Sequence, residues 1–402
     1  MEDLKRKYAR FLIKGCLRLN AGDKLFIIAS SVIEDFVDVV RREAFSLGIK
    51  DVEIQINNPF LQKEKYLTKT YDEIIQDPLF DKTKYNQMAV EGYAFLSLSS
   101  PVPGIFEDVD SELFTKVNTY QMKSMAIYKE YQLKGKIKWC IAAASNSLWA
   151  KDILGDSEDR LWDVIYDICL IKENDPILAW RQKTDKLKRR AHYLNELQID
   201  KLIYYNELGT RLEIGLPKDY LFQSADEGTG NGVLVNMPTE EVFTSPDRLR
   251  VNGKVYSSKP LLYNGTLIDD FWLEFQDGKI VDYDASKGRE ILQGIIETDL
   301  GSHYLGEVAL VDFSSPISLT NILFKNTLYD ENASCHLAIG EGFPECIKDG
   351  LELSSEKLLA KGINMSHKHV DFFVGTRDLE VKAVLQNGRE TVIMKDGNFV
   401  EV

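Results

Sequence analysis

The residues with the clearest capacity for chemistry are histidines and carboxylates in the last hundred residues of the chain. Four of the five histidines lie there, and neutral imidazole is the commonest nitrogen ligand of zinc and related metals. The segment 366–373 has the sharpest pattern. On a strand, His369 and Asp371 would point to the same face, and His367 would share that face. A histidine beside a carboxylate on a strand is half of a metal site, although the segment alone is equally typical of a solvated strand face.

The segment 328–336 holds a second carboxylate and imidazole, Glu331 and His336. Their spacing does not place them on one face of a helix, but a tight turn would bring them together. The alternative is a helix cap, in which the side chain of Asp330 or Asn332 caps a following turn.

Carboxylates also stand at the ends of two apolar, strand-like runs. Glu307 begins one run, and Glu240 and Glu241 precede the other. An ionised carboxylate among Val, Leu and Phe side chains is costly unless it is paired or bound to a cation. The simpler alternatives are a salt bridge for Glu307 and a solvated loop for the two glutamates. Together the four segments supply four carboxylates and two imidazoles, which suits two metal ions that share a carboxylate. The candidate ligands are Glu241, Glu307, Glu331, His336, His369 and Asp371.

The elements that must position these residues differ between the two halves of the chain. Before residue 200, short apolar runs alternate with helical periodicities, and no glycine fingerprint of a dinucleotide site follows the first run. This order favours an α/β domain with helices on both faces of a mostly parallel sheet, an α/β/α arrangement of layers. The predicted strands are 24–29, 51–56, 93–98 and 137–143, and the predicted helices are 3–18, 33–47 and 112–132.

After residue 200, Asn-Gly and Asp-Gly pairs separate strand-like runs, and such pairs supply the positive φ that tight hairpins need. They are Asn252-Gly253, Asn264-Gly265, Asp277-Gly278, Asn387-Gly388 and Asp396-Gly397. We therefore expect a C-terminal α+β domain rich in antiparallel hairpins. The predicted fold class is α/β with two domains, an N-terminal α/β domain over 1–195 and a C-terminal metal-binding catalytic domain over 196–402.

Composition excludes several classes of partner. The 402 residues include 49 Lys and Arg against 63 Asp and Glu, a formal charge of −14. A chain this acidic repels phosphate backbones and anionic lipid, so we expect neither nucleic acid nor a membrane as a partner. The five widely spaced cysteines fit a reducing compartment. Because the N-terminal segment also lacks the apolar core of a signal peptide, we expect a soluble protein of the cytoplasm.

Four strings carry a family resemblance. They are NMPTEEVFTSPD (236–247), LGEVALVD (305–312), LYDENASCHLAIG (328–340) and MSHKHVDFFVG (365–375). In order and separation they resemble the aminopeptidase T family of metalloaminopeptidases, the group of thermophilic metalloprotease-like proteins that includes aminopeptidase S and PepS. Softer likeness extends upstream and covers nearly the whole chain.

The resemblance implies a two-domain α/β protein that forms a homodimer and removes N-terminal residues from peptide substrates. It also implies two divalent metal ions in each chain. The six candidate ligands match the family's ligand positions, with Glu307 and Asp371 as the candidates for shared positions. This set of oxygen and imidazole ligands admits zinc, cobalt or manganese.

One position departs from the family pattern. Seven residues after His336 the family has an active-site tyrosine, and this chain has Phe343. The loss of a phenolic donor favours slow turnover, and it leaves open a family-like metalloprotein with weak or lost peptidase activity. A metal hydrolase of another amide or ester would use the same ligands. Glu240 is a candidate proton shuttle, although neighbouring residues on a strand face opposite ways.

Overall fold

The computed structural model describes residues 2–224, 232–263 and 266–400. Within these residues no helix combines the length and the hydropathy that a bilayer crossing requires. The predicted turn at Asn264-Gly265 lies outside the described residues, although the strands on either side of it pair with each other.

The chain divides into two compact units by its internal packing. The first is Met1–Gln182 with Asp226–Pro238, and the second is Lys183–Ala225 with Thr239–Val402. The division falls inside helix α10 (Pro176–Glu196). The domain boundary expected between residues 195 and 196 stays a prediction.

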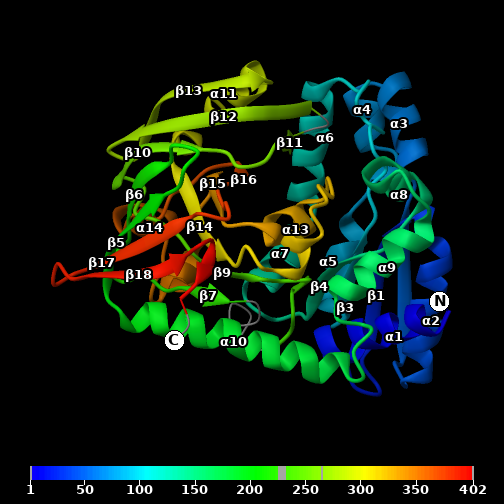
Figure 1. The fold of residues 1–402 in the computed structure, drawn as a ribbon. Coiled ribbons are helices and arrows are strands. Elements are labelled where there is room, and N and C mark those ends of the chain that lie inside the picture. The colour runs from blue at the N-terminus through cyan, green and yellow to red at the C-terminus, as the bar shows by residue number, and fades with distance from the viewer. Residues whose placement is uncertain (1, 225–231, 264–265, 401–402) are drawn as a thin grey trace. The chain divides into compact units, whose positions relative to one another are not determined.

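The first unit contains a parallel sheet, in agreement with the predicted fold class (Figure 1). Its strand order is β2-β1-β3-β4-β8, and every pairing is parallel. The strands are β1 (Lys24–Ser30), β2 (Asp51–Asn57), β3 (Ala94–Ser99), β4 (Trp139–Ala143) and β8 (Asn236–Met237). The central strands are apolar along nearly their whole length because both faces of the sheet are covered.

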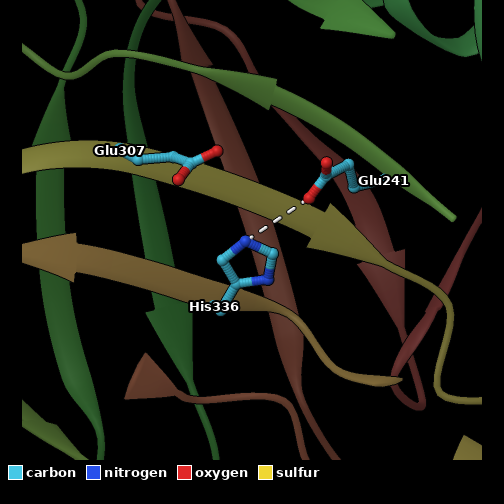
Figure 2. Close-up of side chains that lie close together, drawn as sticks. All are labelled: Glu241, Glu307 and His336. Carbon is cyan, nitrogen blue, oxygen red and sulfur yellow. Dashed lines mark ion pairs between the residues drawn. The ribbon is translucent and has the colours of Figure 1, made fainter. Parts of the chain in front are cut away.

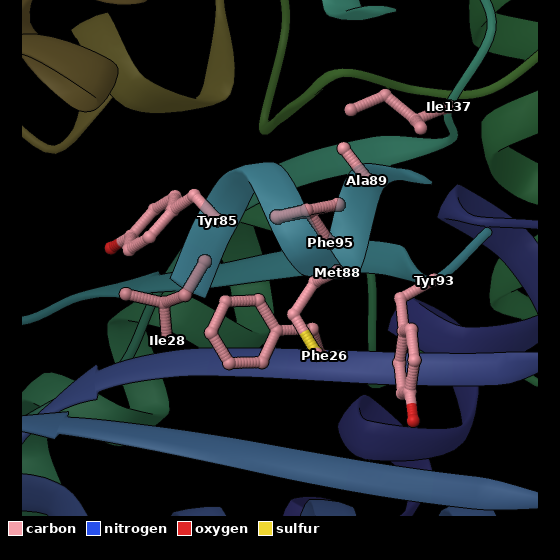
Figure 3. Packing of buried hydrophobic residues seen from close by; sticks show 8 residues of the cluster. All are labelled: Phe26, Ile28, Tyr85, Met88, Ala89, Tyr93, Phe95 and Ile137. Carbon is pink, nitrogen blue, oxygen red and sulfur yellow. The ribbon is translucent and has the colours of Figure 1, made fainter. Parts of the chain in front are cut away.

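Helices cover the two faces of this sheet, as the α/β/α prediction requires. On one face, side chains of helix α5 (Thr83–Val90) cluster with Phe26, Ile28 and Phe95 of the sheet, as Figure 3 shows. On the other, helix α2 (Glu34–Ser46) packs against β1, and the ring of Tyr8 from helix α1 (Glu2–Phe11) stacks on that of Phe36 at 5.7 Å.

The helices differ from the sequence prediction in two places. The predicted helix over 112–132 is two helices, α6 (Ser111–Ser124) and α7 (Ala126–Leu133), because the chain breaks at Met125. The prediction also missed α3 (Pro59–Thr68), α4 (Tyr71–Ile75) and α5, which lie between β2 and β3. These helices are short, so their apolar periodicity is weak. Two further helices, α8 (Ser147–Leu154) and α9 (Glu158–Ile168), follow β4.

The second unit contains two antiparallel sheets, which agrees with the predicted hairpin-rich half. In the larger sheet the order is β11-β12-β10-β6-β5-β17-β18-β19, with β13 paired to β12. Its strands are β5 (Ile199–Tyr205), β6 (Arg211–Gly215), β10 (Val251–Tyr256), β11 (Leu261–Tyr263), β12 (Thr266–Gln276), β13 (Lys279–Lys287), β17 (Glu380–Leu385), β18 (Glu390–Lys395) and β19 (Asn398–Phe399).

The smaller sheet has the order β16-β15-β14-β9-β7. Its strands are β7 (Gln223–Ser224), β9 (Glu241–Thr244), β14 (Leu305–Val311), β15 (His336–Gly340) and β16 (His369–Phe373). Strand β14 is buried along its whole length. Short helices connect the strands of the unit, namely α11 (Arg289–Ile296), α12 (Pro316–Leu319), α13 (Thr327–Asp330) and α14 (Ser355–Ala360).

Three predicted turns connect paired strands, and one prediction is wrong. Asp277-Gly278 joins β12 to β13 with φ of 48° and 83°, the left-handed pair that a tight hairpin needs. Asp396-Gly397 and Asn387-Gly388 join the strands around β18. Asn252-Gly253, however, lies inside β10, where a Cβ on Gly253 would approach the Arg211 carbonyl oxygen to 2.2 Å. There the glycine permits close approach of two strands and makes no turn.

Candidate metal centre

The smaller sheet of the second unit brings most of the predicted ligands to one of its faces. In the antiparallel register, Glu307 pairs with Ala338, and Ala338 pairs with Asp371. Directly opposed residues share a face, so Glu307 and Asp371 point the same way from β14 and β16. By the same rule His336 shares this face through its pairing with Ala309, two residues after Glu307 on β14.

Two groups of ligand-type atoms form on this face. The first contains Glu241, Glu307 and His336, whose atoms lie within 4.8 Å of one another. Figure 2 shows these three side chains converging, with His336 Nε2 3.4 Å from Glu241 Oε2.

The second group contains Glu307, His369 and Asp371, also within 4.8 Å of one another. His369 Nε2 lies 3.1 Å from Glu307 Oε2 and 3.2 Å from Asp371 Oδ1. Glu307 therefore belongs to both groups, which is the geometry of a bridging carboxylate. Asp371 is part of the second group only, so its predicted sharing stays a prediction.

Both imidazoles are oriented by backbone carbonyl groups. His336 Nδ1 lies 3.0 Å from the Ser334 carbonyl oxygen, and His369 Nδ1 lies 2.8 Å from that of Glu341. A carbonyl can only accept, so each Nδ1 carries the proton and donates it. Each Nε2 therefore faces the carboxylates, where its lone pair would bind a metal ion, which is the orientation of metal-binding histidines.

The sixth candidate, Glu331, lies in the short helical turn Glu331–Ala333 that precedes β15. Its Oε1 accepts a hydrogen bond from Asn332 Nδ2 at 3.3 Å. Burial raises the pKa of Glu331 well above its usual value, and the charges of Glu241 and Asp371 raise it further. Glu331 belongs to neither of the two groups, but it lines the same cavity as His369 and Asp371, and its role as a ligand stays a prediction.

The electrostatics of the cluster indicate a missing positive charge. Burial raises the pKa of Glu241 to about 7; His336 opposes this shift, whereas Glu307 adds to it. Within the described residues, Asp371 Oδ1 is buried with no hydrogen-bond partner, although His369 Nε2 lies 3.2 Å away. Several carboxylates in one buried site are costly without a cation. The donor set, its orientation and this orphaned oxygen all fit divalent metal ions.

Other predicted residues lie apart from the two groups. The carboxylate of Glu240 pairs with Lys183, and its backbone N–H donates to Asn332 Oδ1 at 2.7 Å. His367 precedes β16, is exposed, and donates its backbone N–H to Asp299. It therefore does not share the strand face of His369, because the strand begins two residues later than that prediction needs.

The helix-cap alternative for segment 328–336 is also wrong. The carboxylate of Asp330 accepts the backbone N–H groups of Phe324 and Asn326, which precede it in the chain. The Asn332 amide donates to the Leu328 carbonyl oxygen at 3.0 Å. Both side chains thus hold the preceding part of the chain in place and cap no following turn.

Phe343 lies beside the candidate ligands. Its ring centroid is 5.0 Å from that of His369 and 5.5 Å from that of Phe243, and its N–H donates to Ser245 Oγ. Two residues after Phe343, burial raises the pKa of Glu345, and the charge of Glu307 raises it further. Sequence analysis missed Glu345, since a single glutamate after Pro344 has no distinguishing pattern.

A cavity of about 280 Å³ adjoins the cluster. Three candidate ligands, Glu331, His369 and Asp371, form part of its wall, and the His369 side chain is 27% exposed. The remaining walls combine apolar side chains with a few polar ones. They are Pro260, Leu261, Leu262, Tyr263, Leu323, Lys325, Asn326, Thr327, Asp330, Val370 and Phe373.

Residues 1–399 match the family described as thermophilic metalloprotease (M29). The chain belongs to the M29 family. It is 36% identical over 399 residues to aminopeptidase AmpS of Bacillus subtilis, covering 98% of this chain and 97% of that protein. It is equally similar, 36% over 400 residues, to aminopeptidase 2 of Geobacillus stearothermophilus, with the same coverage of both chains.

A solved structure of another member has the same fold as this M29 chain. AmpT from Thermus thermophilus matches with a TM-score of 0.92 and 29% identity, over 99% of each chain. A 2,5-dihydroxypyridine dioxygenase from Pseudomonas putida matches at a TM-score of 0.54 and 12% identity, over 99% of this chain and 96% of that one. The second likeness concerns the fold alone.

Proposed function

We propose that this M29 protein is a metal-dependent aminopeptidase that releases N-terminal residues from peptides, with two divalent ions in each chain. The observation that carries the proposal is the pair of ligand groups that share Glu307. Membership of a metalloprotease family over residues 1–399, with relatives named aminopeptidases, supports the peptide substrate.

The two ions would share Glu307 and differ in their other ligands. Glu241, Glu307 and His336 would hold one, and Glu307, His369 and Asp371 the other. Glu331 completes the six ligands from the loop side. Bound divalent ions supply Lewis-acid chemistry, in which they polarise the scissile carbonyl group and lower the pKa of the attacking water. The donor set admits zinc, cobalt or manganese.

The residues of this chain bind and orient the substrate. The cavity beside Glu331 offers carboxylates to the free α-amino group of a peptide and apolar walls to its first side chain. Opposite charge at this position favours a substrate with a free N-terminus over a blocked one. The backbone carbonyl groups of Ser334 and Glu341 keep both imidazoles in place.

Proton transfer to the leaving amine needs a carboxyl group with a raised pKa. Glu240 was the candidate from sequence, but its carboxylate pairs with Lys183. Burial raises the pKa of both glutamates, but Glu345 fits the role better, because the charge of Glu307 raises its pKa further and, in the described part of the chain, its carboxylate pairs with no Lys or Arg. The pH profile of Glu345→Gln tests this assignment: loss of one ionisation supports it, and an unaltered profile rejects it. Glu352→Gln, at a neighbouring position, is the matched control.

The second candidate function is a metalloprotein with weak peptidase activity, and Phe343 is the observation that favours it. Phenylalanine keeps the shape of tyrosine against His369 but donates no hydrogen bond. The relatives named aminopeptidases do not support a hydrolase of another amide or ester.

We also propose that the protein forms a homodimer, on the basis of the family resemblance. Its composition supports a location in the cytoplasm, which cell fractionation tests.

Activity of metal-stripped protein, restored ion by ion, tests the proposed function. Leu-, Arg- and Asp-arylamides serve as substrates, with their N-acetylated forms as controls that lack a free amine. We expect no turnover without metal, and recovery with zinc, cobalt or manganese on free-amine substrates only. Turnover that survives complete removal of metal, or equal turnover of the acetylated forms, would contradict the proposal.

A further inference from the structure

A second crevice lies in the first unit, at the carboxyl ends of its parallel strands. The sheet order β2-β1-β3-β4 places β2 and β3 on opposite sides of β1. The segments after β2 and β3 therefore diverge there, and such a switch point is where open α/β sheets bind ligands. The crevice has a volume of about 320 Å³, which is within the range of small-molecule sites.

The register of the strands defines the floor of the crevice. Ile28 of β1 pairs with Ser97 of β3, and Ser97 pairs with Ile141 of β4. These three residues share the face on which Phe26 and Phe95 lie, two positions earlier on their strands. Helix α5 covers the part of the face on which Phe26 and Phe95 lie. Ile28 belongs to the same cluster, which Figure 3 shows.

Ser97 is a polar residue between two apolar neighbours of this row. Its hydroxyl lies between Ile28 and Ile141, and beyond Ile28 the row continues to Gln55 of β2. Within the described residues its hydroxyl has no hydrogen-bond partner, and it lines the crevice. A hydroxyl without a partner between two isoleucines contributes little to packing, so its place here favours contact with a ligand.

Two side-chain amides face the same space. Gln62 of helix α3 lines the crevice, and its amide has no partner within the described residues. The Oδ1 of Asn57 accepts a hydrogen bond from the buried Lys82 Nζ at 2.8 Å. This bond fixes the orientation of the Asn57 amide and leaves its Nδ2 group as a donor toward the crevice.

The rest of the lining is uncharged. No Asp, Glu, Lys, Arg or His side chain is among the described residues that line the crevice. A charged ligand group would therefore lose its water without gaining an opposite charge. The remaining lining residues are Ile28, Ala29, Ser30, Pro59, Leu98, Ser99, Ser100, Val102, Ile105, Phe106 and Ile141.

We propose that this crevice binds an uncharged amide that carries an apolar side chain, the chemistry of an interior residue of a peptide. The amides of Asn57 and Gln62 and the Ser97 hydroxyl offer donors and acceptors that an amide group matches. The walls formed by Ile105, Phe106 and the isoleucines of the sheet receive the apolar side chain. The site needs neither the metal ligands nor the proposed aminopeptidase activity.

Methyl NMR on the full-length protein, labelled at isoleucine, tests the proposal. Ile28, Ile105 and Ile141 line the crevice, and substitution of each by valine assigns its signal. The probe is N-acetyl-L-leucinamide, whose blocked amine excludes it as an aminopeptidase substrate. We expect saturable shifts of these three signals at concentrations up to about 10 mM, the range of a weak small-ligand site. N-acetylglycinamide and N-acetyl-L-glutamate, which lack the apolar chain or carry charge, should bind more weakly.

Variants identify the polar contacts. Ser97→Ala and Gln62→Ala should each weaken binding by about threefold to tenfold, the usual value of one hydrogen bond. Gln87→Ala is the matched control, since this exposed glutamine on α5 bonds to Glu91. The proposal is overturned if the unsubstituted protein shows no saturable shift of the three signals. Equal binding of N-acetyl-L-glutamate, or unchanged binding by both variants, would also overturn it.

Discussion

At the scale of single residues, the two imidazoles connect the backbone to the carboxylate cluster. His336 and His369 each donate Nδ1–H to a carbonyl oxygen, which aims Nε2 at Glu241 and Glu307 respectively. An imidazole fixed in this way loses little further entropy when it binds a metal. Removal of one ligand should therefore weaken the binding of the metal ion that its group holds.

His336→Ala should lose at least one of the two ions, and Asp371→Asn should do the same from the second group. His192→Ala is the matched control, because in the described part of the chain this exposed histidine pairs only with Glu196. Elemental analysis of protein offered zinc or cobalt measures the loss. Full metal content in both ligand variants, or no metal in the unsubstituted protein, would contradict the ligand assignment.

Phe343 leads to a prediction about turnover. Negative charge develops on the carbonyl oxygen in the transition state, so a hydroxyl aimed at it acts mainly on kcat. Phe343→Tyr should therefore raise kcat toward the roughly 10²-fold that one such donor is worth, with metal content unchanged. Phe243→Tyr places a hydroxyl on the adjacent ring and is the control. Steady-state kinetics on aminoacyl arylamides decide, and an unchanged kcat on every substrate rejects the prediction.

The titration of the cluster predicts how metal-free protein responds to pH. Burial raises the pKa of Glu241 to about 7, so the folded state holds a proton there that the unfolded chain has released above about pH 4.5. His336 has the same sign, since the carboxylates around it prevail over burial and raise its pKa. Asp371, whose pKa is lowered, contributes no slope above its unfolded value of 3.8.

The free energy of unfolding of metal-free protein should therefore fall as pH rises from about 4.5 to about 7. Bound metal keeps the carboxylates ionised and should remove this fall. Urea unfolding at several pH values, with and without chelator, measures the difference. Stability of the metal-free form that rises across this window would show that the cluster does not hold the protons inferred here.

At the scale of elements, two hairpin turns of the larger sheet contain glycines that fulfil different needs. Gly278 and Gly388 have φ of 83° and 81°. A Cβ on Gly278 would approach the Arg248 carbonyl oxygen to 1.7 Å, whereas one on Gly388 meets nothing within 4 Å. Both glycines satisfy the left-handed backbone, but only Gly278 also permits a close approach between chain segments.

Gly388→Ala should cost about 1 kcal/mol through backbone strain alone. Gly278→Ala should cost more, because the backbone must also move away from the added methyl group. Urea unfolding midpoints of the two variants, compared under the same conditions, check the order. Equal losses would mean that the β12–β13 hairpin relaxes without resistance.

At the scale of the whole molecule, the fold class and the family are settled over the full length of the chain. The family matches residues 1–399 and the AmpT structure matches 99% of the chain. The oligomeric state rests on resemblance. We expect sedimentation equilibrium at micromolar concentration to yield twice the chain mass. A single-chain mass at that concentration would contradict the predicted homodimer.

Local patterns in the sequence were enough for the elements whose physics is local. Apolar runs predicted β1 to β4, and Asp-Gly pairs predicted two hairpins, because positive φ is a property of a few residues. The turn predicted at Asn252-Gly253 is wrong, because a glycine is also needed where two strands approach each other closely. The candidate ligands were recognisable from motifs, since imidazoles and carboxylates are chemically distinctive wherever they occur.

Only the tertiary structure decided which of these residues meet. Glu241 and Asp371 are far apart in sequence, and the register of β9, β14, β15 and β16 is what places them around Glu307. The sequence could not show which partners the adjacent residues Glu240 and Glu241 have, whereas the fold pairs Glu240 with Lys183. Ser97 reads as an ordinary strand serine until its neighbours Ile28 and Ile141 are known. Contacts between distant segments depend on how the strands pair, and no local pattern encodes that pairing.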